Sequence, residues 1–360
     1  GIDVYLRRCF QLEMSSDSTV KKIGVLTGGG DSSGINAVLH GICLEARRLG
    51  IEVVGFREGW RGLIEGSYTP LSFDMTIKEV DRSGTILKTS RTNPYRIASA
   101  QGKIAKTIKE LKLDGLIAIG GNDTLTVASN LYDDLKIPVV GIPQTIDNDV
   151  PGTEYCVGFD TAVHNVVEAI RNVRATCDSH QEDIVVEVMG RQSGWIAAVA
   201  GLTAGAEFIL LPELSFDSQK LVDVLKERHA NGFYSNVIVV AEGVKGIDHT
   251  KIEAGTDAFG NVMLAGIGLG LRDYLQDKLN KKTRAIVLSY IQRGGRPTSY
   301  EVFTALGFGR SAIKALFEGK TDLMIAFRDG TLRPVSLSLA QGTRKVDAEL
   351  VEMVKELTLL

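Results

Sequence analysis

Three turns rich in glycine and aspartate each follow a short apolar run, and this repetition restricts the folds available to the chain. The turns comprise residues 28–31, 120–124 and 145–149. Apolar runs rich in Ile, Val and Leu alternate with segments of helical spacing, a pattern typical of a parallel sheet covered by helices. Ligands bind beyond the carboxyl ends of the strands in such sheets. We therefore expect Gly29, Gly121 and Asp147 to lie close together.

The order of the segments predicts an α/β protein with two consecutive series of strands and helices. Strands are expected at residues 23–26, 51–55, 115–119, 139–142, 184–188, 208–211, 237–240, 283–288 and 323–327. Helices are expected at residues 35–48, 125–131, 161–176, 195–202, 218–229, 264–279 and 302–317. The helix at residues 161–176 precedes the second series, and the strand at residues 323–327 is expected to return to the first sheet.

The composition is that of an ordinary globular protein. The chain has 360 residues, of which 44% are hydrophobic and 24% charged, with a net charge of -3, and this length allows two domains. Basic residues are scattered and balanced by acids, so we expect neither nucleic acid nor a membrane as a partner. The four cysteines lie far apart, and no apolar run has membrane-spanning length. We expect a cytoplasmic protein whose partners are small molecules and other subunits.

The first residues of the sequence do not fit the pattern of strands and helices. They mix Arg7 and Arg8 with apolar side chains, and they lack the long apolar core of a signal peptide. We expect residues 1–14 to be a tag or a disordered extension. Met14 is the expected natural start, because the polar residues 15–19 follow it and precede the first strand.

The first turn joins a strand to a helix through three glycines. Glycine lets backbone N–H groups approach a phosphate closely, and a helix beginning near Asn36 adds positive potential. The turn matches neither the lysine-containing P-loop nor the G-x-G-x-x-G fingerprint, because no lysine follows and Gly34 is displaced. A structural turn capped by Asp31 or Ser32 is an equal alternative. The second turn has the same two interpretations.

The third turn carries two carboxylates, Asp147 and Asp149, two residues apart. Such a pair can divide the work of a general base and a metal ligand. The alternative is a surface turn stabilised by its own Asp and Asn side chains. The apolar run at residues 139–143 precedes the turn and favours its burial, and therefore the functional interpretation.

These turns and several further segments together give the chain a resemblance to the 6-phosphofructokinase superfamily from Lys22 to about Val335. The further segments are residues 84–87, 158–162, 189–191 and 291–295. The resemblance implies the phosphofructokinase fold, which has two Rossmann-like three-layer domains with mostly parallel sheets. The implied division is a donor-binding domain of residues 15–158 and 292–340 and a sugar-phosphate domain of residues 159–291 and 341–360.

The resemblance also implies an activity. The family transfers a phosphoryl group to the 1-hydroxyl of fructose 6-phosphate with Mg²⁺, in homodimers or homotetramers with shared active sites. In the family pattern Asp147 is the general base, Asp149 helps to hold the metal ion, and Thr145 contacts the sugar or the transferred group. Arg91 matches an arginine that bridges both substrates and offsets developing charge. By residue type alone, Arg91 is a solvated loop arginine.

Seven positions match the donor site of the family. They are Gly29, Gly30, Gly121, Asn122, Asp123, Thr124 and Gln144. Gly29 corresponds to a backbone donor to the phosphoryl group. Asp123 stands where ATP-using members have glycine, and its carboxylate would repel a nucleotide α-phosphate. The resemblance is therefore strongest to the pyrophosphate-dependent enzymes, with ATP as the alternative donor.

Seven further positions match the sugar-phosphate pocket. They are Met189, Gly190, Arg191, Glu242, Arg284, Tyr290 and Arg293. Arg284 and Arg293 correspond to clamps for the 6-phosphate, since a planar guanidinium donates two parallel hydrogen bonds. Arg284 is expected to serve a neighbouring subunit. By residue type alone, both arginines are solvated strand ends, and Glu242 is equally a surface acid.

Four positions depart from the family pattern. Asn122 replaces an acid near the metal, and Gln144 replaces a lysine of the pyrophosphate enzymes. Glu182 replaces an arginine that reaches a neighbour's sugar phosphate, and Tyr290 replaces a histidine. These changes keep the general base but alter both substrate pockets. A kinase for another sugar phosphate and a non-catalytic regulatory subunit therefore remain alternatives, with a dinucleotide oxidoreductase more distant.

Overall fold

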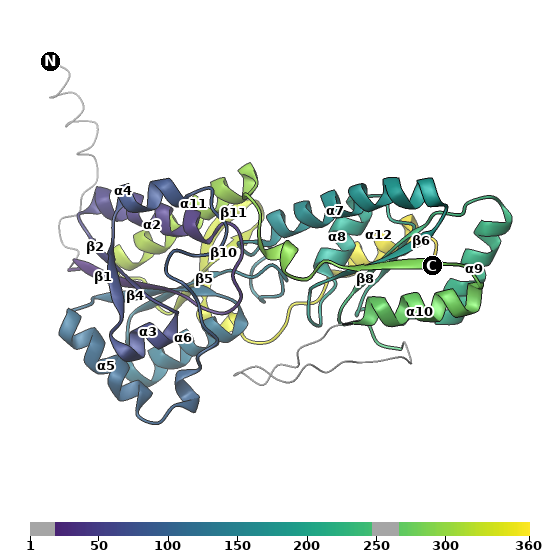
Figure 1. The fold of residues 1–360 in the computed structure, drawn as a ribbon. Coiled ribbons are helices and arrows are strands. Elements are labelled where there is room, and N and C mark those ends of the chain that lie inside the picture. Colours follow the sequence, from purple (N-terminus) through teal and green to yellow (C-terminus); the bar gives the residue numbers. More distant parts are fainter. Residues whose placement is uncertain (1–18, 247–265) are drawn as a thin grey trace, which may run out of the picture.

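The structure is a computed structural model that describes residues 19–246 and 266–360. Its elements form two lobes that lie side by side (Figure 1), each built on its own sheet. The prediction for residues 1–14 lies outside the described residues, as does the predicted helix start at residue 264. No helix within the described ranges is both long and apolar enough to cross a membrane.

The first lobe contains a seven-stranded sheet in the order β11-β10-β5-β4-β1-β2-β3. Its strands are β1 (Lys22–Thr27), β2 (Glu52–Phe56), β3 (Tyr68–Leu71), β4 (Gly115–Gly120), β5 (Val139–Pro143), β10 (Leu323–Arg328) and β11 (Thr331–Ser336). The inner strands are parallel, while β3 and β11 pair antiparallel at the two edges. The inner strands β1, β4 and β5 are almost wholly buried, which explains their near-continuous apolar sequence.

Helices cover both faces of this sheet. They are α2 (Ile35–Leu49), α3 (Trp60–Glu65), α4 (Phe73–Thr76), α5 (Ala100–Leu111), α6 (Asn122–Leu135) and α11 (Ser299–Phe317). α2 and α11 share a core with Val25 and Ile117, whereas α3, α5 and α6 share a second core with Leu26 and Leu116. Because neighbouring strand residues point to opposite faces, the two cores lie on the two sides of the sheet and the lobe has three layers.

The second lobe is built on a four-stranded parallel sheet in the order β7-β8-β6-β9. Its strands are β6 (Asp183–Val188), β7 (Phe208–Leu210), β8 (Val237–Ala241) and β9 (Thr283–Val287). Its helices are α7 (Phe159–His180), α8 (Trp195–Thr203), α9 (Ser218–Ala230), α10 (Ile267–Leu279) and α12 (Ala348–Leu357). Figure 1 shows α7, α8 and α12 on one side of the sheet and α10 on the other.

Helix ends follow local signals in the sequence. The Asp217 carboxylate accepts hydrogen bonds from the backbone amides of Gln219 and Lys220, so α9 starts at Ser218 as predicted. The Thr298 hydroxyl caps α11 in the same way. α2 ends at Leu49, and Gly50 follows with a φ of 70°, in the left-handed region that glycine adopts without strain.

The predicted α/β class, the mostly parallel sheets and the return of residues 323–327 to the first sheet are confirmed. Every predicted strand is present, with no end shifted by more than one residue. The short or edge elements α3, α4, β3 and β11 were not predicted, nor were α5 and α12. Parallel pairing of β1, β4 and β5 places their carboxyl ends, and hence the three turns, at one edge of the sheet.

Candidate active site

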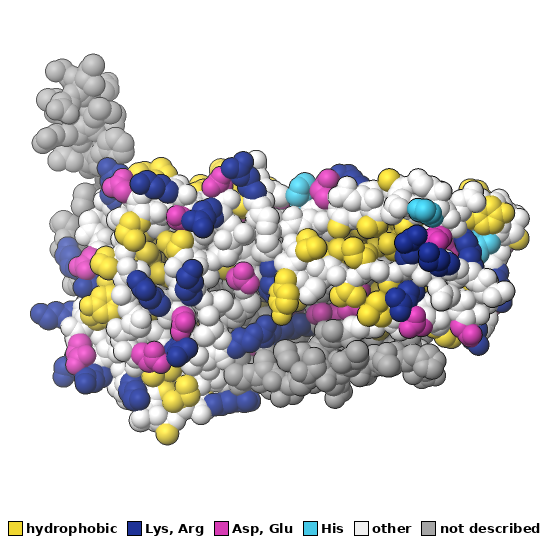
Figure 2. Space-filling model, viewed as in Figure 1, with side chains coloured by type: hydrophobic (Ala, Val, Ile, Leu, Met, Phe, Trp, Pro, Cys, Tyr) yellow, Lys and Arg dark blue, Asp and Glu magenta, His cyan; other side chains and the backbone are white. Residues whose placement is uncertain are grey.

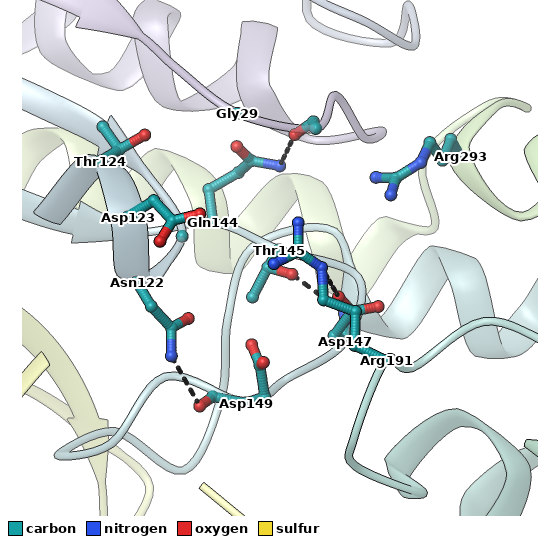
Figure 3. Close-up of a pocket in the computed structure, with 12 residues that line it drawn as sticks. Gly29, Asn122, Asp123, Thr124, Gln144, Thr145, Asp147, Asp149, Arg191 and Arg293 are labelled. Carbon is teal, nitrogen blue, oxygen red and sulfur yellow. Dashed lines mark hydrogen bonds and ion pairs between the residues drawn. The ribbon is translucent and has the colours of Figure 1, made fainter. Parts of the chain in front are cut away.

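A cavity lies at this edge of the first sheet and faces the second lobe. Its lining consists of Gly29, Gly30, Gly121, Asn122, Asp123, Thr124, Gln144, Thr145, Asp147, Asp149, Arg191 and Arg293. All of these residues were predicted as site residues from the sequence. The three turns therefore converge as expected, and two arginines of the later chain join them (Figure 3).

The first turn brings backbone close to the cavity because it consists of glycine. Gly29 has a φ of 79°, in the left-handed region. A β-carbon on Gly30 would lie 2.5 Å from Nη1 of Arg293, so any other residue here would displace the guanidinium from its present place. The amide of Gly29 donates to the carbonyl of Ser90 at 3.2 Å, and its carbonyl accepts from Oγ1 of Thr89 at 2.7 Å. The turn is thus held in place from the side away from the cavity.

The second turn directs the N-terminus of α6 at the cavity. Gly121 is the N-cap residue, and no side chain caps the helix. The first-turn residues Asn122, Asp123 and Thr124 all line the cavity, where the backbone amides of a helix N-terminus and the helix dipole favour an anion. The carboxylate of Asp123 stands in this first turn and adds a negative charge at the same place.

The third turn buries its two aspartates. The backbone amide of Asp147 donates to Oγ1 of Thr145 at 3.1 Å, and Nδ2 of Asn122 donates to the carbonyl of Asp149 at 3.3 Å. Burial raises the pKa of Asp149 to about 7, the charge of Asp147 adds to this effect, and Arg191 opposes it. The predicted alternative of an exposed surface turn is therefore wrong, because both aspartates are almost fully buried.

Two buried acceptor atoms in the cavity wall lack protein partners. They are Oδ1 of Asp147 and Oε1 of Gln144, neither of which has a hydrogen bond within the described part of the chain. A buried polar atom without a partner is costly, so a bound ligand or ion is the natural partner here. The other end of the Gln144 amide is fixed, since Nε2 donates to the Gly30 carbonyl and to Oγ of Ser32, both at 3.0 Å.

The carboxylate of Asp149, beside the charge of Asp147, fits a divalent cation. Burial and mutual repulsion disfavour two negative charges together, and a cation would relieve both effects. Among the described residues, no three His, Cys, Asp or Glu side chains form a metal cluster. Mg²⁺ is usually bound by one or two carboxylates plus substrate phosphates and water, so a sparse protein ligand set suits it.

The second lobe supplies the facing wall through residues at the carboxyl ends of its own strands. After β6, Arg191 places its Nε 3.8 Å from Oδ2 of Asp147 across the cavity. Oε1 of Glu242, after β8, accepts hydrogen bonds from the amides of Gly190 at 3.2 Å and Arg191 at 2.8 Å. Burial and the charge of Asp147 raise the pKa of Glu242 to about 7. After β9, Nη1 of Arg293 donates to the Asp31 carbonyl at 3.0 Å.

Several predicted residues do not line the cavity. Met189, Gly190 and Glu242 lie behind Arg191, while Arg91 is exposed in the segment that follows Ser90. Tyr290 is 78% exposed. Arg284 lies in β9 and forms an ion pair with Glu182, which Lys282 also approaches at 3.5 Å.

Residues behind the walls were not predicted from the sequence. Oε1 of Gln292 accepts the amide of Met189 at 3.1 Å, and Oε1 of Glu213 accepts the amide of Gly194 at 3.1 Å. Arg344 is hydrogen-bonded to the turn that carries Asp149. No local sequence pattern marks such supporting residues, because their partners are distant along the chain.

Known proteins share this sequence and architecture. A family model described as "Phosphofructokinase" matches residues 22–316. A pyrophosphate--fructose 6-phosphate 1-phosphotransferase of Dictyoglomus thermophilum is 43% identical over 338 residues, covering 93% of this chain and 97% of the relative. The protein of the same name from Amycolatopsis methanolica is 45% identical, covering 90% and 95%. An ATP-dependent 6-phosphofructokinase of Thermotoga petrophila is 38% identical, covering 93% and 98%.

A solved structure agrees with the fold. The pyrophosphate-dependent phosphofructokinase of Nitrosospira multiformis superposes with a TM-score of 0.81, covering 91% of this chain and 86% of that one. At 23% sequence identity this likeness concerns the fold alone. The predicted arrangement of two lobes with mostly parallel sheets is therefore confirmed.

Proposed function

The chain belongs to the phosphofructokinase family, and from this premise we propose that it transfers a phosphoryl group from pyrophosphate to the 1-hydroxyl of fructose 6-phosphate, giving fructose 1,6-bisphosphate. The observation that carries the choice of donor is Asp123, whose carboxylate lines the cavity in the first turn of α6. A nucleotide α-phosphate beside it would meet like charge, which pyrophosphate avoids. Relatives at 43% and 45% identity carry the corresponding name.

In this reaction Asp147 is the general base that takes the proton of the sugar hydroxyl. Its Oδ1 is buried and has no partner among the described residues, so it can accept that proton donor directly. The Nε of Arg191 lies 3.8 Å from Oδ2 of the same carboxylate, on the facing side of the cavity. Thr145 holds the Asp147 amide and so fixes the turn.

The donor phosphates are held by backbone and cations together. The N-terminus of α6 offers backbone N–H groups to these phosphates, whereas the guanidinium of Arg293, which also lines the cavity, is proposed to clamp the 6-phosphate of the sugar. Asp149 and Asn122 would hold Mg²⁺, which neutralises phosphate charge when bound. Arg91 is proposed to offset charge in the transition state, as its place in the family pattern implies.

We also propose that the active protein is a homodimer or homotetramer with shared sites. Arg284 and Tyr290 match the sugar-phosphate pocket but lie outside the cavity of their own chain, as expected if they serve a neighbour. Figure 2 shows hydrophobic side chains gathered over the middle of the second lobe. Elsewhere Ile291, and Phe303 on α11 of the first lobe, are also strongly exposed. Exposed apolar patches often mark interfaces.

We further propose where the protein acts in the cell and which substrate each domain binds. The protein is proposed to act in the cytoplasm. Residues 15–158 with 292–340 would bind the donor, and residues 159–291 with 341–360 the sugar phosphate. Support for this division comes from the sheets, since the first takes its strands from residues 22–143 and 323–336 and the second from residues 183–287.

Parallel assays test the proposal. Purified protein is given fructose 6-phosphate and Mg²⁺ with either pyrophosphate or ATP, and fructose 1,6-bisphosphate is measured. We expect turnover with pyrophosphate and little with ATP. Turnover with ATP alone would overturn the donor assignment. No turnover with either donor, across several sugar phosphates, would favour a non-catalytic subunit.

An ATP-dependent kinase is the second candidate. Gln144 stands beside the glycine turn as a neutral amide, so the donor site lacks the cation that the pyrophosphate enzymes usually place there. Relatives named as ATP-dependent enzymes are also similar over nearly the whole chain. The same pair of assays separates the two donors.

A further inference from the structure

The chain crosses between the lobes near its C-terminus. Residues 342–346, here called the C-terminal strap, connect the end of the first lobe to α12 and appear as a thin yellow crossing in Figure 1. The strap contributes no residue to the described lining of the cavity, yet it contacts the backs of both walls. The Gly342 carbonyl accepts a hydrogen bond from Asn122, and Nζ of Lys345 donates to the Gln192 carbonyl.

The backbone of Arg344 links the two walls directly. Its amide donates to the carbonyl of Asp149 at 2.7 Å, in the acidic turn of the first lobe. Its carbonyl accepts from Oγ of Ser193 at 3.1 Å, two residues after Arg191 in the second lobe. One residue therefore binds the turn that carries the acids and the loop that carries the facing arginine.

The side chain of Arg344 makes a second bridge between the lobes. Its guanidinium carbon lies 4.1 Å from the ring centroid of Trp195, the first residue of α8. Nη1 donates to the Glu154 carbonyl at 2.9 Å, and Nη2 pairs with Asp347 at 2.9 Å. Only 15% of the side chain is exposed, so the stacked guanidinium is largely shielded from water.

We propose that Arg344 is a positioning residue that fixes the distance between the Asp147–Asp149 turn and the Arg191 loop. Arg191 Nε and Asp147 Oδ2 lie 3.8 Å apart, beyond hydrogen-bond distance, so this contact leaves the separation of the walls adjustable. Arg344 holds the two walls together from outside the cavity. It does so through its backbone hydrogen bonds, its stacking on Trp195 and its hydrogen bond to Glu154. The inference rests on the proposed function, because the aligned groups are the general base and the sugar pocket.

Kinetics of three variants test the positioning role. Arg344→Met keeps the length of the side chain but removes the guanidinium, and we expect kcat to fall about 10- to 100-fold, since small misplacements of reacting groups are costly. Arg344→Lys keeps a cation over Trp195 and loses the planar fork, so it should give an intermediate kcat. Asp347→Asn is the control and should leave kcat unchanged, because Asp347 is 62% exposed.

KM separates positioning from loss of substrate contact. Since Arg344 does not line the cavity, the KM for each substrate should change by less than about threefold in all three variants. A kcat of Arg344→Met within about threefold of wild type, in an enzyme that is active, overturns the proposal. Arg344→Lys carries the same test if Arg344→Met does not fold.

Hydrogen exchange of the full chain gives a readout that needs no activity. We expect faster amide exchange at residues 147–149 and 190–194 in Arg344→Met, and wild-type exchange there in Asp347→Asn. Unchanged exchange in either segment would contradict the positioning role. A uniform rise in exchange over both lobes would also contradict it, because Arg344 would then stabilise the fold as a whole. If the wild-type protein turns over no donor, the proposed function fails while this measurement still decides the role of Arg344.

Discussion

The two lobes face one cavity with different chemistry, although both present the carboxyl ends of parallel strands to it. The first lobe offers backbone amides, the N-terminus of α6 and the carboxylates of Asp147 and Asp149. The second lobe offers the side chain of Arg191 after β6, whose backbone amide donates to Glu242 after β8. Backbone groups and short acids suit phosphate and metal, whereas long side chains can read the shape of a sugar.

The part of the cavity formed by the first lobe is here called the first wall, and the part formed by the second lobe the second wall. We expect substitutions in the two walls to have different effects. Changes on the first wall should alter the rate or the choice of donor, because that wall touches the transferred group. Changes on the second wall should alter the affinity for the acceptor. The kinetics of the variants below will either agree with these separate effects or contradict them.

The largest effect is expected on the first wall, from Asp147→Asn. Loss of the general base should lower kcat by about 10²- to 10⁴-fold and leave both KM values nearly unchanged, because the amide keeps the size of the side chain. Steady-state kinetics with both substrates measure this. Asp133→Asn, exposed on the far part of α6, is the matched control. A nearly normal kcat in Asp147→Asn would remove this residue from the reaction.

Asp123→Gly should change the preference between the two donors and leave the affinity for the sugar phosphate unchanged. Removing a carboxylate near the phosphates should raise the ratio of kcat/KM for ATP over pyrophosphate by about tenfold or more, which corresponds to about 1.4 kcal/mol. Asp123→Asn keeps the volume and removes the charge, so it separates repulsion from crowding. An unchanged ratio in both variants would show that Asp123 does not select the donor.

Glu242→Gln tests the second wall. With one charged acceptor fewer for the amides of Gly190 and Arg191, the sugar pocket should loosen, and the KM for fructose 6-phosphate should rise about tenfold while kcat and the KM for pyrophosphate stay close to wild type. The carboxylate loses its charge as pH falls through its pKa of about 7, so the wild-type KM for the sugar should rise below that pH. The variant should lack this dependence. Parallel pH profiles in the two proteins would contradict the assignment.

The first wall could be predicted from the sequence because its signals are local. Gly29, Gly121 and Asp147 each follow an apolar strand at once, and parallel strands bring such turns to one edge. The buried strands were predictable for the same reason, since β1, β4 and β5 are almost continuously apolar. Short edge strands such as β3 carry half-exposed residues and no comparable signal.

The supporting contacts could not be predicted, because they depend on distant parts of the chain. Arg344 reaches Glu154 and Trp195, far away in sequence, and nothing in its neighbours marks it. Arg284 is paired with Glu182 in its own chain, and its role toward a neighbouring subunit stays a prediction. The role of Arg91 also stays a prediction, since the residue is exposed beside the glycine turn.

A smaller effect is expected where the lobes join. Glu301 on α11 accepts hydrogen bonds from the amides of Gly158 at 2.8 Å and Thr161 at 3.1 Å, at the start of α7, and from the Tyr155 hydroxyl at 2.7 Å. The side chain is fully buried, and burial raises its pKa from 4.5 to about 7 despite these bonds. Glu301 therefore ties both lobes together and belongs to neither wall.

Glu301→Gln should change stability with pH and leave the preference for donor and acceptor alone. A carboxyl whose pKa is raised by folding stabilises the native state below its unfolded pKa, and this contribution is lost as pH rises through about 7. The excess unfolding free energy of wild type over the variant should thus shrink by about 1–3 kcal/mol between pH 5 and pH 8. Denaturant unfolding at both pH values measures it, with exposed Glu356→Gln as the control. A difference that is the same at both pH values would show that Glu301 titrates alike in the folded and unfolded chain.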